Sequence, residues 1–181
     1  MNLAILYDDA FLDHEARGYH PECSERLVAL RRALEEADLW EGALHLSARE
    51  ATDEELTRVH TPAYVEATLR RLDGGHGHLD PDTFYSPGSR KAALGAAGGG
   101  VDLVRKVWAR DAEAGLALVR PPGHHAEASR AMGFCIFNNV AIAAAALLAD
   151  GAERILVFDP DVHHGNATQH QFEDRSDVLY V

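Results

Sequence analysis

Two carboxylates and two imidazoles lie close together near the C-terminal end of the chain. They belong to Asp-Pro-Asp-Val-His-His-Gly-Asn (residues 159–166), which follows the apolar run 155–158. Residues two apart in extended backbone point to the same side, so Asp159, Asp161 and His163 are predicted to share one side. Carboxylate oxygen and imidazole nitrogen are common zinc ligands. Asp161 and His163 are therefore predicted to bind a divalent metal; the alternative is an acidic turn with incidental histidines.

A second pair of imidazoles, His124 and His125, follows Arg-Pro-Pro-Gly. Unperturbed imidazole titrates at about pH 6.5, so these rings could carry protons, although surface histidines without a role are the alternative. A metal that acidifies water and a base that takes its proton are the main parts of a hydrolytic site. A carboxylate or amide beside each ring would fix its tautomer, and Asp159 and Asn166 are the nearest candidates.

The segments that must position these residues alternate between strands and helices. Apolar runs predict strands at residues 3–7, 116–119, 155–159 and 178–181, and helical spacing predicts helices at 24–37, 52–56, 61–72, 89–109 and 140–148. This alternation predicts one α/β domain over residues 1–181, with a parallel sheet flanked by helices. Active sites in such sheets lie beyond the carboxyl ends of the strands, where both histidine segments are expected.

Two glycine-rich segments carry separate expectations. Residues 73–89, rich in Gly, His, Pro and Asp, predict a surface loop. Gly98, Gly99 and Gly100 fall inside a predicted helix, where each costs about 1 kcal/mol relative to alanine. Another part of the chain is therefore expected to pack closely against these glycines.

The composition narrows the classes of function. With 29 acidic and 17 basic residues the net charge is −12, which disfavours a nucleic-acid partner and suits either a cationic substrate or a solvated acidic surface. Cys23 and Cys135 are too few for a disulfide framework, which favours a reducing, cytoplasmic location. The first residues lack the pattern of a signal peptide, and the apolar run 140–149 is half the length of a membrane span, so no membrane partner is expected.

Two long motifs in the expected order, RPPGHHAEASRAMGFCIFNNVAIAA and VFDPDVHHGNATQ, resemble the signature of the histone deacetylase family. The likeness is greatest to class II and bacterial deacetylase-like members, and extends to acetylpolyamine amidohydrolases and acetoin-utilisation proteins. Weaker matches at residues 20–26 and 79–83 extend it over nearly the whole chain. The resemblance implies a three-layer arginase/deacetylase-like fold. It also implies removal of acetyl groups from acetylated lysine or polyamine-type amines, with one Zn²⁺ or Fe²⁺ per chain and a structural K⁺ near Asp159.

Residue roles follow from the resemblance by position. It implies that Asp161 and His163 bind zinc, that His125 is the general base, and that Asp159 and Asn166 orient His124 and His125 respectively.

Four further positions would serve the substrate. Asp82 matches a rim residue that grips the substrate backbone, Gly133 and Phe134 would line the tunnel for the acetylated amine, and Arg26 matches an arginine of the cavity through which acetate leaves.

The chain departs from the family pattern in three ways. The family's third zinc ligand and its carbonyl-polarising tyrosine lie beyond Val181. The chain is therefore expected to be a domain truncated at the C-terminus, with impaired catalysis, because losing one such donor costs about 10²–10³ in rate. Pro160 replaces an aromatic or aliphatic residue and should end the strand ladder at Asp159 or distort it. Ala167 replaces glycine and would be strained at positive φ.

Two other functional readings remain open. One is a non-catalytic fragment or partner-binding remnant of a deacetylase. The other is a ureohydrolase such as arginase, which uses two metals and a further carboxylate shortly after the histidine, where this chain has His164, Gly165 and Asn166. Homo-oligomerisation is left open as well.

Overall fold

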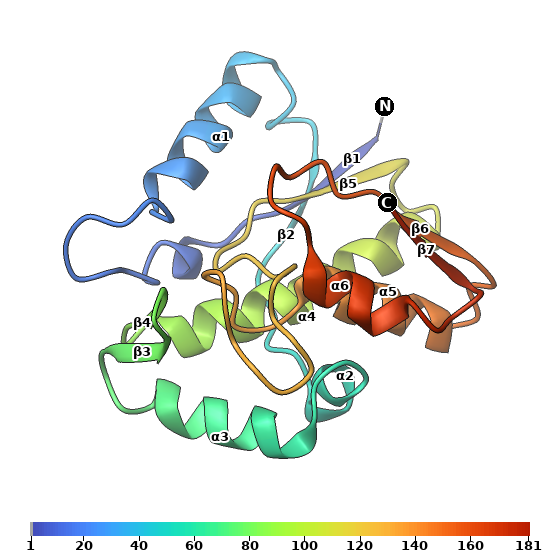
Figure 1. Cartoon of the computed structure of the whole chain (residues 1–181). Coiled ribbons are helices and arrows are strands. Elements are labelled where there is room, and N and C mark those ends of the chain that lie inside the picture. The colour runs from blue at the N-terminus through green and yellow to red at the C-terminus, as the bar shows by residue number, and fades with distance from the viewer. Residues whose placement is uncertain (1) are drawn as a thin grey trace.

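Parallel strands form the centre of the computed structural model, which describes residues 2–181 (Figure 1). One sheet has the order β2 (Leu44–Leu46), β1 (Leu3–Leu6), β5 (Ala114–Ala117), and a separate sheet pairs β6 (Ile155–Val157) with β7 (Val178–Tyr180). Within both sheets the neighbouring strands are parallel. An antiparallel hairpin joins β3 (Gly77–Asp80) to β4 (Thr83–Tyr85).

Helices cover both sides of β1. The helical elements are η1 (Asp9–Phe11), α1 (Glu25–Glu36), α2 (Asp53–Thr57), α3 (Pro62–Leu72), α4 (Ser89–Trp108), α5 (Asn139–Ala149) and α6 (Asn166–Phe172). Leu27 of α1 and Leu103 of α4 belong to the same buried cluster as the four residues of β1, and Figure 1 shows the two helices on opposite sides of that strand. The predicted architecture, a parallel sheet flanked by helices, is confirmed.

The glycines of α4 mark a close contact. A Cβ on Gly98 would collide with the backbone of residues 49–51, and one on Gly99 would meet the Leu6 side chain at 2.7 Å. Apart from the neighbouring residues and backbone of α4 itself, nothing lies within 4 Å of the Cβ position of Gly100. The expected close packing is therefore present at two of the three glycines.

Some predicted boundaries were wrong. Residues 73–89 are not only a loop, because they contain the β3–β4 hairpin, where Thr83 and Phe84 are buried. The strand expected at 116–119 occupies Ala114–Ala117 instead. Strand β2 and helix α6 were not predicted.

Pro160 and Ala167, the two residues that depart from the family pattern, fit their backbone. Asp159 still donates its N–H to Val181 O at 2.8 Å, so the ladder ends just before Pro160, as one of the two expectations held. Ala167 lies inside α6 and is not among the residues with positive φ, so alanine causes no backbone strain at this position. Among residues 2–181, no helix is both long enough and apolar enough to cross a membrane.

Candidate functional site

The two histidine segments meet beyond the carboxyl ends of β5 and β6. His124 Nδ1 lies 2.8 Å from Asp159 Oδ2, and the backbone N–H of Ala167 donates to His124 O at 3.2 Å. The His124 and His125 rings are neighbours, with centroids 4.1 Å apart. Because a carboxylate only accepts hydrogen bonds, His124 Nδ1 carries the hydrogen and its Nε2 is the free nitrogen.

His125 has a different partner. Its Nδ1 lies 2.6 Å from Asn166 Oδ1, at the first residue of α6. The Nδ2 group of Asn166 donates to the Glu127 carboxylate, which fixes which end of the amide faces His125. An amide oxygen accepts only, so His125 Nδ1 is the donor and Nε2 is left to accept a proton. Glu127, two residues after His125, was not predicted as part of the site.

Tyr180 is a second residue that the sequence reasoning missed. Its hydroxyl donates to Asp159 Oδ2 at 3.2 Å and accepts from the backbone N–H of Gly165 at 3.0 Å. Burial raises the pKa of Tyr180, so its hydroxyl keeps the proton that it donates. A polar residue at the end of the neighbouring strand β7 was the available signal, since parallel strands end at one edge.

The two predicted metal ligands lie together at the surface. Asp161 Oδ1 is 3.1 Å from His163 Nδ1, and the side chains are 49% and 74% exposed. Two ligands of a tetrahedral zinc ion lie about 3.3 Å apart, given bonds of about 2.0 Å. The backbone N–H of His163 holds the pKa of Asp161 below its usual value, which keeps it an anion.

The donor chemistry of this pair therefore fits one divalent ion, but the number of donors is short. Among residues 2–181, no third His, Cys, Asp or Glu completes a group that could hold a metal. A catalytic zinc site has three protein ligands.

The predicted tunnel residues form a strained turn beside His125. Gly133 and Phe134 have φ of +57° and +68°, an unfavourable region for phenylalanine. Asp82 Oδ1 accepts from Gly133 N–H at 3.2 Å, and Thr83 Oγ1 accepts from Phe134 N–H at 3.1 Å. Asp82 is therefore held against the chain's own backbone, and the β3–β4 hairpin supports the turn.

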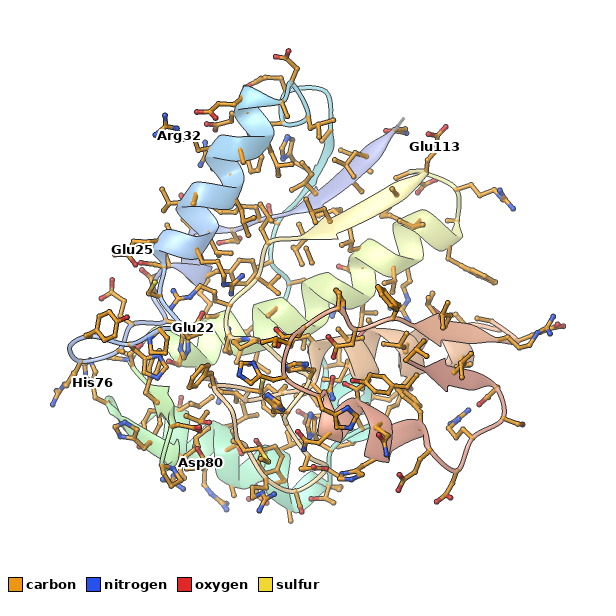
Figure 2. The ribbon with its side chains drawn as sticks, turned by 45° about the horizontal axis from the view of Figure 1, so that its top comes forward. Glu22, Glu25, Arg32, His76, Asp80 and Glu113 are labelled. Carbon is orange, nitrogen blue, oxygen red and sulfur yellow. The ribbon has the colours of Figure 1, made fainter. Side chains whose placement is uncertain are left out.

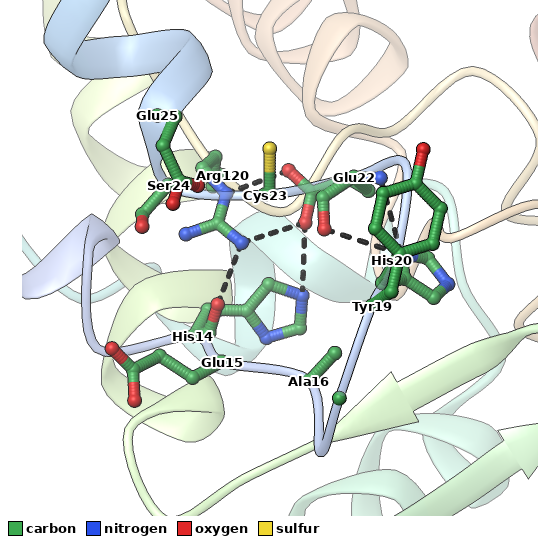
Figure 3. Close-up of a pocket in the computed structure, with 11 residues that line it drawn as sticks. His14, Glu15, Ala16, Tyr19, His20, Glu22, Cys23, Ser24, Glu25 and Arg120 are labelled. Carbon is green, nitrogen blue, oxygen red and sulfur yellow. Dashed lines mark hydrogen bonds and ion pairs between the residues drawn. The ribbon is translucent and has the colours of Figure 1, made fainter.

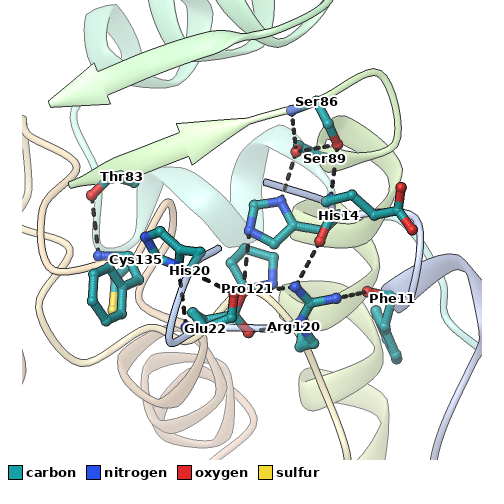
Figure 4. A network of polar contacts seen from close by, with 12 residues as sticks. Phe11, His14, His20, Glu22, Thr83, Ser86, Ser89, Arg120, Pro121 and Cys135 are labelled. Carbon is teal, nitrogen blue, oxygen red and sulfur yellow. Dashed lines mark hydrogen bonds and ion pairs between the residues drawn. The ribbon is translucent and has the colours of Figure 1, made fainter. Parts of the chain in front are cut away.

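A buried ion pair joins Glu22 to Arg120, four residues before His124 (Figure 4). Arg120 binds Glu22 through two hydrogen bonds of 2.6 and 2.8 Å and also donates to Phe11 O and His14 O. Burial alone would raise the pKa of Glu22, but the Arg120 guanidinium outweighs it and lowers that pKa. The loop that carries Glu22 is thereby fixed to the base of the histidine segment.

Arg26 does not reach the cavity next to this ion pair. That cavity has a volume of about 480 Å³ and is lined by Arg120 and by most of the residues from His14 to Glu25 (Figure 3). Arg26 instead donates to Val119 O at 3.0 Å, and its side chain is 43% exposed. The structure thus brings together the histidine pair with Asp159 and Asn166, and Asp82 with Gly133 and Phe134, while Arg26 stands apart from both groups.

Comparisons with known proteins agree with this geometry. The profile described as "Histone deacetylase domain" matches residues 20–181. Histone deacetylase 15 of Arabidopsis thaliana is 41% identical over 98% of this chain and 33% of its own length. The human protein named Polyamine deacetylase HDAC10 is 43% identical over 99% of this chain and 29% of its own length.

A solved structure, the HDA15 HD domain, superposes with a TM-score of 0.94 at 41% identity, covering 99% of this chain and 52% of that chain. The chain therefore spans about a third of these full-length relatives and about half of the solved chain, and its fold is the arginase/deacetylase-like one. With the profile matching most of its length around the paired histidines, the chain belongs to the histone deacetylase family.

Proposed function

We propose that this chain carries the histidine pair and part of the metal centre of a zinc-dependent amidohydrolase, one that removes acetyl groups from acetylated lysine or polyamine-type amines. The observation that carries the proposal is that two histidines, each oriented by its own partner, lie beside the Asp161–His163 pair. The His125 and His163 ring centroids are 6.3 Å apart. Relatives named as histone and polyamine deacetylases support the choice of reaction.

In the proposed reaction His125 is the general base. Its Nδ1 is committed to Asn166, so Nε2 takes the proton of the attacking water. Asp159 holds His124 in the corresponding tautomer and faces the positive charge that this ring would carry. Asp161 and His163 would hold a divalent ion, which when bound would acidify that water and polarise the amide carbonyl.

We assign the metal to Asp161 and His163, as Zn²⁺ or Fe²⁺, and a structural K⁺ to the neighbourhood of Asp159. One ion per chain separates this proposal from a ureohydrolase, which would bind two. Because residues 2–181 contain no group of three His, Cys, Asp or Glu residues that could hold a metal, catalysis by the chain on its own is proposed to be impaired.

The substrate side of the proposal uses the remaining residues. Gly133 and Phe134 line the path of the acetylated amine, and Asp82 lies at its rim. Arg26, which contacts Glu22 and Val119 O outside the cavity, would act on the departing acetate only from its edge. A net charge of −12 favours cationic amines over nucleic acid. The free thiols Cys23 and Cys135 fit the proposed cytoplasmic location.

The test is zinc-dependent deacetylation of an acetyl-lysine peptide and of N-acetylated polyamines. The chain is assayed alone and after refolding with a polypeptide that supplies the half of the HDA15 HD domain without a counterpart here. Activity of the mixture that His125→Ala abolishes is expected. A mixture that binds zinc but hydrolyses neither substrate would favour the non-catalytic or partner-binding alternative.

A further inference from the structure

Residues 132–135 form a tight turn that lies against the proposed base. Met132 and Cys135 pair with each other, through Met132 N–H to Cys135 O at 3.2 Å and Cys135 N–H to Met132 O at 2.9 Å. Between them, Gly133 and Phe134 have φ of +57° and +68°, and positive φ at both central residues is typical of a type I′ turn. Glycine, asparagine and aspartate dominate these places, so a phenylalanine at the second one needs support from the rest of the molecule.

That support comes from the β3–β4 hairpin. The N–H groups of the two central residues take no part in closing the turn, so both need acceptors elsewhere. Asp82 Oδ1 accepts from the N–H of Gly133 at 3.2 Å, and Thr83 Oγ1 accepts from the N–H of Phe134 at 3.1 Å. Figure 4 shows the Thr83 side chain directed at the turn, close to Cys135.

Thr83 connects these two contacts. It is fully buried in β4, at 0% exposure. Because the Phe134 N–H is a donor, Thr83 Oγ1 accepts there and keeps its own hydrogen for Asp82 Oδ1, 3.3 Å away. One hydroxyl therefore binds both the main chain of the turn and the carboxylate that holds the other N–H of the turn.

The hairpin fixes Thr83 itself and also supports the ring of Phe134. Asp80, the last residue of β3 (Figure 2), accepts through Oδ1 from the backbone N–H of Thr83 at 3.0 Å. The Phe134 ring centroid lies 4.7 Å from that of His20, and the His20 ring lies 4.7 Å from Phe84 of β4. Strand β4 thus holds the backbone of Phe134 through Thr83 and its ring through Phe84 and His20.

The position of the turn matters because His125 rests on it. A Cβ on Gly133 would overlap the His125 ring, so the main chain at residue 133 leaves that ring little room to move. On its Nδ1 side the ring is 2.6 Å from Asn166 Oδ1. A turn that relaxed would free the ring and loosen its hydrogen bond to Asn166.

We propose that Thr83 is a positioning residue for the reaction proposed above. Its hydroxyl keeps the turn at Gly133 and Phe134 in the left-handed region, and so holds the wall of the substrate path and keeps His125 Nδ1 on Asn166. The assignment rests on the proposed function, because it takes His125 as the base and Phe134 as part of the substrate path.

Asp82 cannot replace Thr83 in this role. Asp82 binds the N–H of Gly133, and glycine adopts positive φ without strain. Thr83 binds the N–H of Phe134, the residue for which this backbone is unfavourable. Without the Thr83 hydroxyl, the Phe134 N–H loses its acceptor at the strained position of the turn.

The test compares Thr83→Val, which keeps the shape of the side chain but removes the hydroxyl, with Thr83→Ser, which keeps the hydroxyl. Amide hydrogen exchange of the full chain reports on the turn, and ¹⁵N NMR of the imidazole reports on the tautomer of His125. In Thr83→Val the Phe134 amide should exchange about tenfold faster, and the His125 tautomer with hydrogen on Nε2 should gain population about threefold. Thr83→Ser should restore both signals, and Thr83→Ala takes the place of Thr83→Val if the valine variant does not fold.

Ser86→Ala is the matched control. Ser86 is also buried, and its hydroxyl contacts Asp13 O at 3.0 Å and the N–H of Glu15 at 3.1 Å, not residues of the turn. This variant should lose stability without changing the Phe134 exchange rate or the His125 tautomer. The assignment is overturned if removal of the Thr83 hydroxyl leaves either signal unchanged, if Thr83→Ser fails to restore them, or if Ser86→Ala changes them equally.

Neither metal nor acetylated substrate is needed for these measurements. Failure of the deacetylation assay would count against the proposed function, whereas the exchange and NMR signals judge the role of Thr83 in the position of the turn and of His125. The two failures are therefore distinguishable.

Discussion

Asn166 controls the proposed base through an amide that could face either way. Glu127 accepts hydrogen bonds only, so it selects the Nδ2 end and turns Oδ1 toward His125. Replacing it by Glu127→Gln offers a partner that can donate or accept, and the amide loses its preference. We expect a smaller population of the His125 tautomer with hydrogen on Nδ1, measured by ¹⁵N NMR of the imidazole, and a loss of activity of about tenfold in an assembled enzyme.

His170→Gln is the control for this prediction. His170 also contacts Glu127, with Nδ1 3.0 Å from Oε1, but its side chain is 54% exposed and it does not touch His125. This substitution should leave the tautomer of His125 as it is. Equal changes in both variants would show that Glu127 acts through the general surroundings and not through the amide.

Arg120 is the residue whose loss should cost most stability. It satisfies a buried carboxylate, Glu22, together with two backbone carbonyls. Arg120→Met would leave that buried carboxylate with only the longer contact to Arg26, 3.4 Å from Glu22 Oε1, and lower the free energy of unfolding by roughly 3–5 kcal/mol. Adding Glu22→Gln should recover part of the loss in urea unfolding, and a double variant no better than the single one would contradict the ion-pair account.

Much of the site could be predicted from the types and spacing of residues within the two motifs. Contacts made by residues from other strands could not. The pairing of His124 with Asp159 and of His125 with Asn166 was anticipated from the two motifs, and both contacts are present. Tyr180 reaches the site only because β7 lies next to β6, which spacing along the chain does not reveal.

At the level of helices and strands, α4 offers a matched pair of substitutions. Gly98→Ala places a methyl group against the backbone of residues 49–51, and Ala51 N would lie only 2.6 Å away. We expect a loss of about 1–3 kcal/mol in the free energy of unfolding. Gly100→Ala meets nothing within 4 Å outside the neighbouring backbone of its own helix and should gain about 0.5–1 kcal/mol from helix propensity. Thermal unfolding of both variants checks the signs, and a Gly98→Ala protein as stable as Gly100→Ala would refute the contact.

The long helices and several short strands were predictable, but β2, the β3–β4 hairpin and α6 were not. The apolar spacing of residues 89–109 was enough to find α4, which spans Ser89–Trp108. Strand β2 has three residues and the β3–β4 hairpin is rich in residues of low strand propensity, so both are stabilised by pairing with distant or adjacent backbone, not by local preference. Helix α6 begins at Asn166, the last residue of the segment 159–166. That segment was interpreted as a set of site residues, so the short helix that starts at its end was not recognised.

For the whole molecule, two buried histidines should make stability depend on acidity. Burial lowers the pKa of His14 and of His60 to about 4. Unfolded histidine titrates near 6.5, so as the pH falls from 6.5 toward 4 protons bind preferentially to the unfolded chain. The free energy of unfolding should therefore fall over this range, by roughly 3 kcal/mol per ring at most.

Urea unfolding at several pH values measures this dependence, and His60→Gln should remove about half of it. An amide can still donate to Glu127 O and accept from the Asn138 N–H, as the ring does. The exposed His76 provides the control, since His76→Gln should leave the slope unchanged. A slope that His60→Gln does not alter would assign the acid sensitivity to other groups.

The turn at Gly133 has an implication for how the imidazole of His125 is kept in place. A Cβ on Gly133 would stand 2.7 Å from His125 Cγ, and the His124 ring flanks the same imidazole with its centroid 4.1 Å away. The imidazole therefore rests against bare main chain, and the room it occupies exists only because position 133 has no side chain. A single methyl group at position 133 would therefore displace the His125 ring, although the substitution removes none of the residues that take part in the proposed chemistry.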